Sequence, residues 1–310
     1  MQKEMTLEKV YDKVDEMSRY CIDQNIKVDD IEFDSLDFIR IAGESHIVRP
    51  VAQRSISNRL GIPYQYLKRC PQDIQAQNLN HWIQHEKNEK LFFRFDGEER
   101  DVRAVFTPRY VPVDNFEALE RLSSVGYKPE TVVQCSLDPE FMSLSIPDGN
   151  KSFNINGDKF TPGITISNSE VGLASLSISA FVLRLICTNG LISTTGVSAS
   201  YRHVSTKILE EFPDVLEKVS YELGDKKDQF IISMDSVVDN PESSMVNFNK
   251  RFQLNKIEQE AVNWGWCHDV GQTMFHVIQA YTKGSQYQYL NAESSFKLQR
   301  TGGNILAMLN

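Results

Sequence analysis

The chain has 310 residues, of which 41% are hydrophobic and 24% are charged, as in ordinary globular proteins with a substantial core. No apolar run approaches the ~20 residues of a membrane-spanning helix, and the first residues, MQKEMTLEKVYDKVDEMSRY, lack the apolar segment of a signal peptide. The five cysteines are scattered without a CxxC pair, which favours reduced thiols. These features predict a cytoplasmic protein without membrane attachment.

The net charge of −9 is unevenly distributed along the chain. Residues 1–48 hold 6 Lys and Arg against 12 Asp and Glu, whereas residues 49–110 hold 11 against 7. A polyanion would therefore meet the chain at residues 49–110. An ordinary solvated surface would give the same modest excess, so both readings stay open.

The first part of the chain predicts helices interrupted by one extended segment. Apolar residues at helical spacing predict a helix over residues 6–23, with Thr6 as its N-cap. The alternating residues 29–42, DDIEFDSLDFIRIA, indicate an extended segment or short strand. In residues 51–71, VAQRSISNRLGIPYQYLKRCP, a Gly-Ile-Pro break separates two helices, and the second begins near Pro63.

Residues 90–106, KLFFRFDGEERDVRAVF, give the clearest local pattern, a hairpin that turns around Asp96-Gly97. Its cations Lys90, Arg94 and Arg103 would lie on the opposite face from its apolar residues, or at the strand ends. The expected apolar face comprises Leu91, Phe93, Phe95, Val102, Ala104 and Phe106.

Further elements complete the centre of the chain. Asp114 can cap a helix that begins near Asn115, with Glu117 completing a capping box. Two more hairpins turn at Asp138-Pro139 and at Asn156-Gly157, and residues 176–187, LSISAFVLRLIC, favour a strand. From about Ser205 onward, the apolar spacing is helical almost throughout.

This order predicts an α+β protein with an antiparallel β-rich centre built from hairpins. An N-terminal helical segment and a mostly α-helical C-terminal part would flank that centre. The expected regions, which together can form one continuous domain, are an N-terminal helical region with a helix-turn-helix-like corner at 1–89, an antiparallel β-rich core at 90–197 and an α-helical region at 198–310.

Potential metal ligands are sparse. The densest group lies near a predicted helix, but its spacing matches no CxxC or HxxxH pair, so packed helix residues explain it better. A second pair, His81 and His85, lacks a nearby carboxylate. We therefore expect neither a metal nor a cofactor. The residues of the densest group are Cys267, His268, Asp269 and His276.

The sequence does not identify a set of catalytic residues. Cys187 would need a base such as His203 to act as a nucleophile, and a free cysteine in an apolar run is more often a small buried hydrophobe. The chain contains no GxSxG, Walker or GxGxxG pattern. An enzyme is not excluded, but the sequence favours a non-catalytic protein.

Two elements could contact nucleic acid. Residues 55–70 are typical of a helix-turn-helix whose second helix ends in Lys68 and Arg69, although helix corners that bind no DNA share this pattern. The basic hairpin and the segment after it could bind phosphates and stack bases, at about 1–3 kcal/mol per base. Alternatively, its aromatic residues are core and its arginines are solvated. The residues concerned are Phe92, Arg94, Arg100, Arg103, Arg109 and Tyr110.

Three motifs together resemble the phage- and plasmid-borne family known as domain of unknown function 932. They are VRAVFTPRYVPVDNFEAL at 102–119, PGITISNSEVG at 162–172 and RLICTNGL at 184–191, and the resemblance covers about residues 45–310. It implies a mobile-element protein in DNA transactions such as recombination, strand protection or annealing, or one that counters host defence. The positions that carry the resemblance, with no role assigned to any, are Arg103, Tyr110, Asp114, Asn115, Asn168, Ser169, Glu170, Gly172, Arg184, Cys187, Asn189 and Gly190.

These observations predict a non-catalytic protein that binds nucleic acid, with single-stranded DNA as the expected ligand and oligomerisation if annealing is its task. The alternatives are a protein-binding module that inhibits a host defence complex and, third, an enzyme acting on nucleotides or nucleic acid. The expected contacts are Arg94, Arg103, Arg109 and Arg184 with phosphates, Tyr110 or Phe92 with bases, Asn168 and Asn189 with backbone or base edges, and Lys68 and Arg69 at the helix corner.

Arg184 raises a separate question because it lies in an apolar predicted strand, between Leu183 and Leu185. An arginine there needs either a buried carboxylate or an external anion. We expect Glu170 to be that carboxylate.

Overall fold

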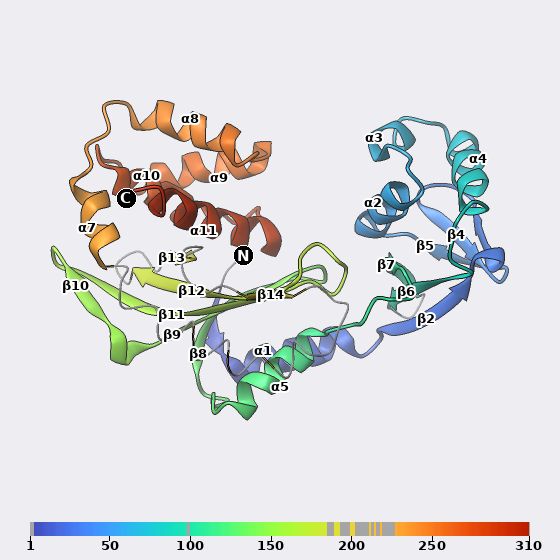
Figure 1. Cartoon of the computed structure of the whole chain (residues 1–310), viewed down its shortest axis with the longest axis horizontal. Helices are drawn as coiled ribbons and strands as arrows, with labels where there is room; N and C mark the ends of the chain where they lie inside the picture. Colours follow the sequence, from blue (N-terminus) through green and yellow to red (C-terminus); the bar gives the residue numbers. More distant parts are fainter. Residues whose placement is uncertain are drawn as a thin grey trace.

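The computed structural model describes residues 3–97, 100–184, 189–192, 199–201 and 227–309, together with residues 211, 214 and 218. The protein is α+β, with antiparallel sheets and helices, as the sequence predicted (Figure 1). Cys187, His203 and most of residues 205–226 lie outside the described residues.

The largest sheet is antiparallel and has the strand order β1-β8-β9-β11-β12-β13, with β10 paired to β11 and β14 paired to β12. Its two predicted hairpins form, with turns at Asp138-Pro139 and Asn156-Gly157, and β12 is a strand as expected. The strands are β1 (Lys3–Thr6), β8 (Val132–Leu137), β9 (Met142–Pro147), β10 (Phe153–Ile155), β11 (Asp158–Asn168), β12 (Leu176–Arg184), β13 (Asn189–Ile192) and β14 (Ala199–Tyr201).

Helices α1 (Leu7–Ser18) and α5 (Asn115–Ser124) pack side by side on one face of this sheet (Figure 1). The strands alternate, so that every second residue is apolar and faces these helices. Leu144 and Ile166, for example, share a core with Leu7 and Leu119. Thr6 lies at the N-cap of α1, as predicted.

The other face of the sheet carries Ser, Thr and Gln side chains, yet it is also buried. Alternation of this kind is typical of a sheet with one solvated face. Here the C-terminal helices cover that face (Figure 1), and Ser145 and Thr165 hydrogen-bond to each other across neighbouring strands at 2.6 Å. The C-terminal helices are α7 (Lys227–Asp235), α8 (Pro241–Arg251), α9 (Lys256–Trp266), α10 (Met274–Gly284) and α11 (Ala292–Leu306), of which α10 and α11 contact the strands most.

A smaller part of the molecule, which we call the lobe, comprises residues 22–106 and is inserted between α1 and α5 (Figure 1). We call the remainder the body. The lobe has two three-stranded sheets and a hydrophobic core of its own, which includes Ile39, Leu67 and Phe93. Its elements are β2 (Ile22–Lys27), β3 (Ile31–Phe33), β4 (Phe38–Ile41), β5 (Glu44–Ile47), α2 (Pro50–Arg59), α3 (Tyr64–Leu67), α4 (Gln72–Ile83), β6 (Lys90–Asp96) and β7 (Asp101–Phe106).

Residues 1–89 are therefore not a purely helical region, because they contain the five strands β1 to β5. The extended segment at 29–42 and the helix break before Pro63 form as predicted. β1 and β2 were not predicted, since both are short and β2, IDQNIK, is almost wholly exposed and has too few apolar residues for a period to show.

The β6–β7 hairpin forms as predicted, but its register shifts between Arg94 and Phe95. Arg94 pairs with Ala104 and Phe95 pairs with Val102, which leaves Arg103 as the extra residue of a β-bulge. The prediction that Val102 and Ala104 lie on one apolar face of the hairpin is consequently wrong. Val102 joins the lobe core, whereas Ala104 packs against Val171 of the body.

Candidate functional site at the junction of lobe and body

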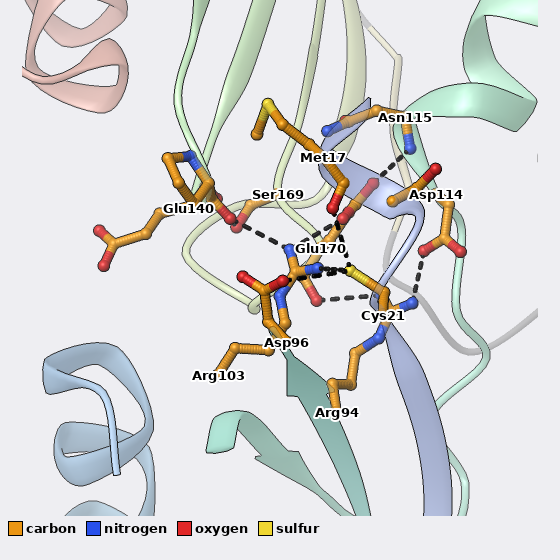
Figure 2. Close-up of polar contacts among 12 residues, drawn as sticks. Met17, Cys21, Arg94, Asp96, Arg103, Asp114, Asn115, Glu140, Ser169 and Glu170 are labelled. Atoms are coloured by element: carbon orange, nitrogen blue, oxygen red, sulfur yellow. Dashed lines mark hydrogen bonds and ion pairs between the residues drawn. The ribbon is translucent and has the colours of Figure 1, made fainter. Parts of the chain in front are cut away.

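Two of the three family-like motifs meet where the lobe contacts the body (Figure 2). Strands β6 and β7 of the lobe bring Arg94 and Arg103 to this place. The start of α5 and the segment after β11 bring the body residues. We call Arg94, Arg103, Asp114, Asn115 and Glu170 the junction cluster.

Arg103 and Glu170 form the central ion pair of the junction cluster. Nη2 of Arg103 donates to Oε2 of Glu170 at 2.8 Å and to the Pro139 carbonyl at 3.1 Å, and the arginine is only 5% exposed. The other carboxylate oxygen of Glu170 accepts the backbone N–H of Asn115 at 2.8 Å. A carboxylate at this position also suits the positive end of the α5 dipole. Glu170 thus joins β7 to the start of α5.

Arg94 is 2% exposed and connects β6 of the lobe to the residue before α5 in the body. It donates to Asp23 at 2.9 Å, to Asp114 at 2.6 Å and to the Glu170 carbonyl at 3.2 Å. Burial lowers the pKa of Arg94, but Asp114 and Asp23 outweigh burial, so its pKa lies above the ordinary value and it stays charged.

Asp114 precedes the first residue of α5, as predicted, and Glu117 accepts its N–H at 3.0 Å in the expected capping-box manner. Burial is the main cause that raises the pKa of Glu117 above its ordinary value. Asp114 therefore has two roles, because the same residue starts α5 and pairs with Arg94.

In the Asn-Ser-Glu-Val-Gly segment, residues 168–172, each polar side chain forms hydrogen bonds within the protein. The Asn168 amide donates to the Val113 carbonyl at 2.9 Å and to Oδ1 of Asn115 at 3.0 Å. The Ser169 hydroxyl donates to the Glu140 carbonyl at 2.8 Å. Gly172 has φ +84, and a Cβ atom there would lie 2.6 Å from the Phe106 ring, so this position requires glycine.

The aromatic residues expected to stack on bases, Tyr110 and Phe92, contact rings within the fold. The Tyr110 ring lies parallel to Phe106, with a centroid separation of 3.7 Å, and Phe92 contacts Tyr110 at 5.6 Å. Burial raises the pKa of Tyr110 well above its ordinary value. Its hydroxyl points toward the Glu170 carbonyl at 3.4 Å.

Arg184 lies away from the junction cluster, and the expected pairing with Glu170 is wrong. Its guanidinium donates to Asp158 at 2.9 Å and to Asp269 at 2.8 Å and lies over the Phe275 ring. The prediction failed because Glu170 is already paired with Arg103. Asp269, which the sequence offered as a metal ligand, is instead an ion-pair partner.

Three of the four arginines expected to contact phosphates are thus held by internal carboxylates. Arg94, Arg103 and Arg184 are buried or nearly so, while Arg109 is exposed. Lys68 and Arg69 are also exposed, but α3 before them has only four residues, about 6 Å of helix. The expected helix-turn-helix is therefore a tight corner rather than two full helices. The side chain of Asn189 lies outside the described residues.

A pocket of about 170 Å³ lies beside the Arg103–Glu170 pair, at the C-terminal end of α1. Tyr20, one of its lining residues, is 54% exposed. Cys21 is adjacent, with its Sγ 2.9 Å from Nη1 of Arg103, and burial raises the pKa of this thiol while Arg103 opposes the rise. The pocket is lined by Val14, Glu16, Met17, Ser18, Tyr20, Asp96, Arg103, Asn115, Pro139 and Glu170.

In the part of the chain that the structure describes, no group of three His, Cys, Asp or Glu residues could hold a metal ion. His85 contacts the His81 carbonyl through Nδ1 at 2.9 Å, and His268 contacts the Trp264 carbonyl at 2.7 Å. Within the same residues, no helix is long and apolar enough to cross a membrane.

Comparison of the chain with protein-family models, with curated proteins and with solved structures finds no match. The resemblance to domain of unknown function 932 therefore stays a prediction.

Proposed function

We propose that this protein binds single-stranded nucleic acid, with DNA as the expected form, through the α2–α3 corner of the lobe and without catalysing a reaction. In keeping with the resemblance, the binding would serve strand protection or annealing in recombination. The observation that carries this proposal is the distribution of paired and unpaired charge in residues 49–110.

Three of the five described carboxylates of this segment form ion pairs within the fold. Arg49 pairs with Asp96 and Asp101, and Arg59 pairs with Glu86. Other cations of the segment are exposed and form no ion pair with any described residue, whereas Asp73 and Glu89 are its only described carboxylates in the same situation. The unpaired charge that the described part of the segment presents is therefore mainly positive. The exposed cations are Arg54, Lys68, Arg69, Lys87, Lys90 and Arg109.

Three of these cations gather around aromatic rings at the α2–α3 corner. The Tyr64 ring lies 6.0 Å from the Arg54 guanidinium and 5.6 Å from Nζ of Lys68. Tyr66, three residues before Arg69, is 49% exposed. Exposed aromatic rings beside cations suit a single strand, because bases can stack while phosphates contact the cations.

The test is a salt titration of binding to a fluorescent oligothymidylate, followed by anisotropy. The wild-type protein should lose affinity steeply with salt, with a log–log slope near −0.7 for each phosphate neutralised. The double variant Lys68→Ala, Arg69→Ala should bind more weakly, with a slope flatter by about 1.4, because two phosphate contacts are lost.

The matched control is Lys9→Ala, Lys13→Ala, which removes two exposed lysines of α1 and the same net charge. It should leave the slope unchanged. Absence of binding at low salt would contradict the proposal. An equal loss of affinity in both double variants would mean that net charge alone causes the effect. The α2–α3 corner would then not be the binding site.

A further inference from the structure

Three ring-bearing side chains at the C-terminal end of α4 lie on the surface of the lobe and contact one another. The ring centres of His81 and His85 are 5.0 Å apart, and the Trp82 ring lies 5.1 Å from His81 and 5.7 Å from His85. Both histidines are exposed, and Trp82 is 46% exposed. We call these three residues the α4 cluster. Its rings are accessible to a ligand or to another molecule.

The ring nitrogens of the two histidines are available for a metal ion. Nδ1 of His85 lies 2.9 Å from the His81 carbonyl oxygen. A carbonyl oxygen only accepts, so the proton of the neutral His85 ring is on Nδ1 and the lone pair is on Nε2. Metal-binding histidines are typically held in this way, with the second ring N–H on a backbone carbonyl. The His81 ring forms no hydrogen bond within the described part of the chain.

The spacing of the two imidazole rings matches that of two ligands on one ion. A ring nitrogen lies about 1.2 Å from the centre of its imidazole, and zinc lies about 2.0–2.1 Å beyond the nitrogen. Two imidazoles at a tetrahedral angle on one zinc ion therefore have ring centres about 5.2 Å apart. The observed separation is 5.0 Å. Imidazole nitrogens suit Zn²⁺, whereas Mg²⁺ and Ca²⁺ take oxygen ligands.

Two imidazoles supply only half of a tetrahedral zinc site. Glu86, the carboxylate next to His85 in the sequence, already accepts from Arg59 and from Asn88, both at 2.7 Å. The described residues contain no group of three potential ligands. Because the α4 cluster is on the surface, a second copy of the chain can supply the two missing imidazoles across a two-fold axis. The exposed Trp82 rings would then lie in the interface, where tryptophan is enriched.

We infer that the α4 cluster binds Zn²⁺ between two copies of this chain, with His81 and His85 of each copy as the four ligands. The number of ligands, their nitrogen donors and their ring spacing all agree with a structural site of this metal. The sequence predicts no metal here, because the histidine pair lacks a nearby carboxylate, but the imidazoles of a second copy take the place of that carboxylate. This inference goes beyond the proposed nucleic-acid binding and does not depend on it.

The test is sedimentation velocity of the full chain with and without Zn²⁺. Protein treated with EDTA should sediment as a monomer, and half an equivalent of Zn²⁺ per chain should convert it to a dimer. Mg²⁺ at the same concentration should leave it monomeric, because it prefers oxygen ligands. A dimer that persists in EDTA, or a protein that stays monomeric with Zn²⁺, overturns the inference.

His85→Ala removes one ligand from each copy at an exposed position, and it should weaken the zinc-dependent dimer at least about tenfold, since loss of even a hydrogen-bond partner of a metal ligand costs that much affinity. His268→Ala is the matched control. His268 is also exposed, and its Nδ1 contacts the Trp264 carbonyl at 2.7 Å, but it has no histidine four residues before or after it. The control should dimerise with Zn²⁺ as the wild-type protein does. An equal loss in both variants, or no loss in His85→Ala, overturns the location.

Tryptophan fluorescence gives a second measurement at the same place. Addition of Zn²⁺ should shift the emission of the wild-type protein to shorter wavelength, because the Trp82 ring passes from water into the interface. Trp82→Phe keeps the four zinc ligands and should still dimerise, but without this shift. A zinc-dependent dimer whose emission does not change, or an equal shift in Trp82→Phe, overturns the placement of the interface at the α4 cluster.

Discussion

Glu170 contacts three segments that are far apart in the chain. Its carboxylate binds Arg103 of β7 and the N–H of Asn115 at the start of α5, and its carbonyl accepts from Arg94 of β6. Breaking a buried ion pair leaves one charge without compensation, which is more costly than losing an exposed pair.

Glu170→Gln should therefore lower the free energy of unfolding by about 3–5 kcal/mol, measured by urea denaturation. Arg19→Ala is the control, because Arg19 pairs with Asp15 at 2.9 Å with both side chains more than half exposed, and it should leave the free energy of unfolding nearly unchanged. Similar losses in the two variants would show that the junction cluster contributes no more than a surface pair.

Glu140 gives a pH-dependent prediction. Its side chain points away from the junction cluster (Figure 2), and its pKa is raised chiefly by burial and also by Asp138, with Arg54 opposing. The folded state therefore holds more protons than the unfolded state between the ordinary Glu pKa, about 4.3, and the raised value. The stability contributed by this group consequently falls as pH rises through that window.

Glu140→Gln should raise the melting temperature at pH 7, where the wild-type carboxylate is charged, and the gain should vanish below about pH 4, where the wild-type group is protonated too. Scanning fluorimetry across this pH range measures both. Glu130→Gln, at an exposed position, should show neither effect. A gain of equal size at both pH values would mean that the charge is not its cause.

The members of the junction cluster could be predicted from the sequence, but their pairing could not. Arg103, Asn115 and Glu170 stood out in motifs, and all three meet at the junction. Their partners depend on the β-bulge at Arg103, which directs the Arg103 side chain toward Glu170. A bulge leaves no recognisable pattern in the sequence of an alternating strand. Arg184 was given the wrong carboxylate for the same reason.

At the scale of the secondary-structure elements, the alternation of polar and apolar residues in the large sheet suggests a solvated face that is in fact buried. Residues such as Ser143 and Ser145 alternate with Leu144, which typically marks a solvated face. The helices of the C-terminal part cover that face, and hydroxyl pairs satisfy each other there. Strand identity followed from the local pattern. The burial of the polar face follows from helices more than 100 residues later and could not be predicted locally.

The α9–α10 contact gives a prediction for the helices. A Cβ atom on Gly265 would lie 2.2 Å from the Ala280 carbonyl, so the two helices approach through this glycine. Gly265→Ala should force them apart and lower the free energy of unfolding by about 1–3 kcal/mol, measured by urea denaturation.

Gly149→Ala is the matched control, because nothing lies within 4 Å of its added Cβ. It should change stability by less than about 0.5 kcal/mol. Equal stability of Gly265→Ala and wild-type protein would mean that the α9–α10 contact adjusts freely.

At the scale of the whole molecule, the lobe and the body have separate cores that meet at the junction cluster. Arg94 joins them, since it pairs with Asp23 in the lobe and with Asp114 in the body. Arg94→Met should therefore speed amide hydrogen exchange in residues 90–115, while β9 and β11 exchange as in the wild-type protein. Mass spectrometry of peptic fragments measures this. Faster exchange throughout the chain would instead indicate that Arg94 supports the entire fold.

The insertion of the lobe also dictates when parts of the body can fold during synthesis. β1 pairs with β8, with Lys3 opposite Cys135, so the whole lobe leaves the ribosome before β1 has a partner. The lobe, with its own core, can form in that interval, whereas α1 stays without α5. The body residues that precede the lobe thus stay without their sheet and helix partners until α5 and β8 have been made, and their apolar side chains, Leu7 and Val10 among them, are uncovered on the nascent chain during that interval.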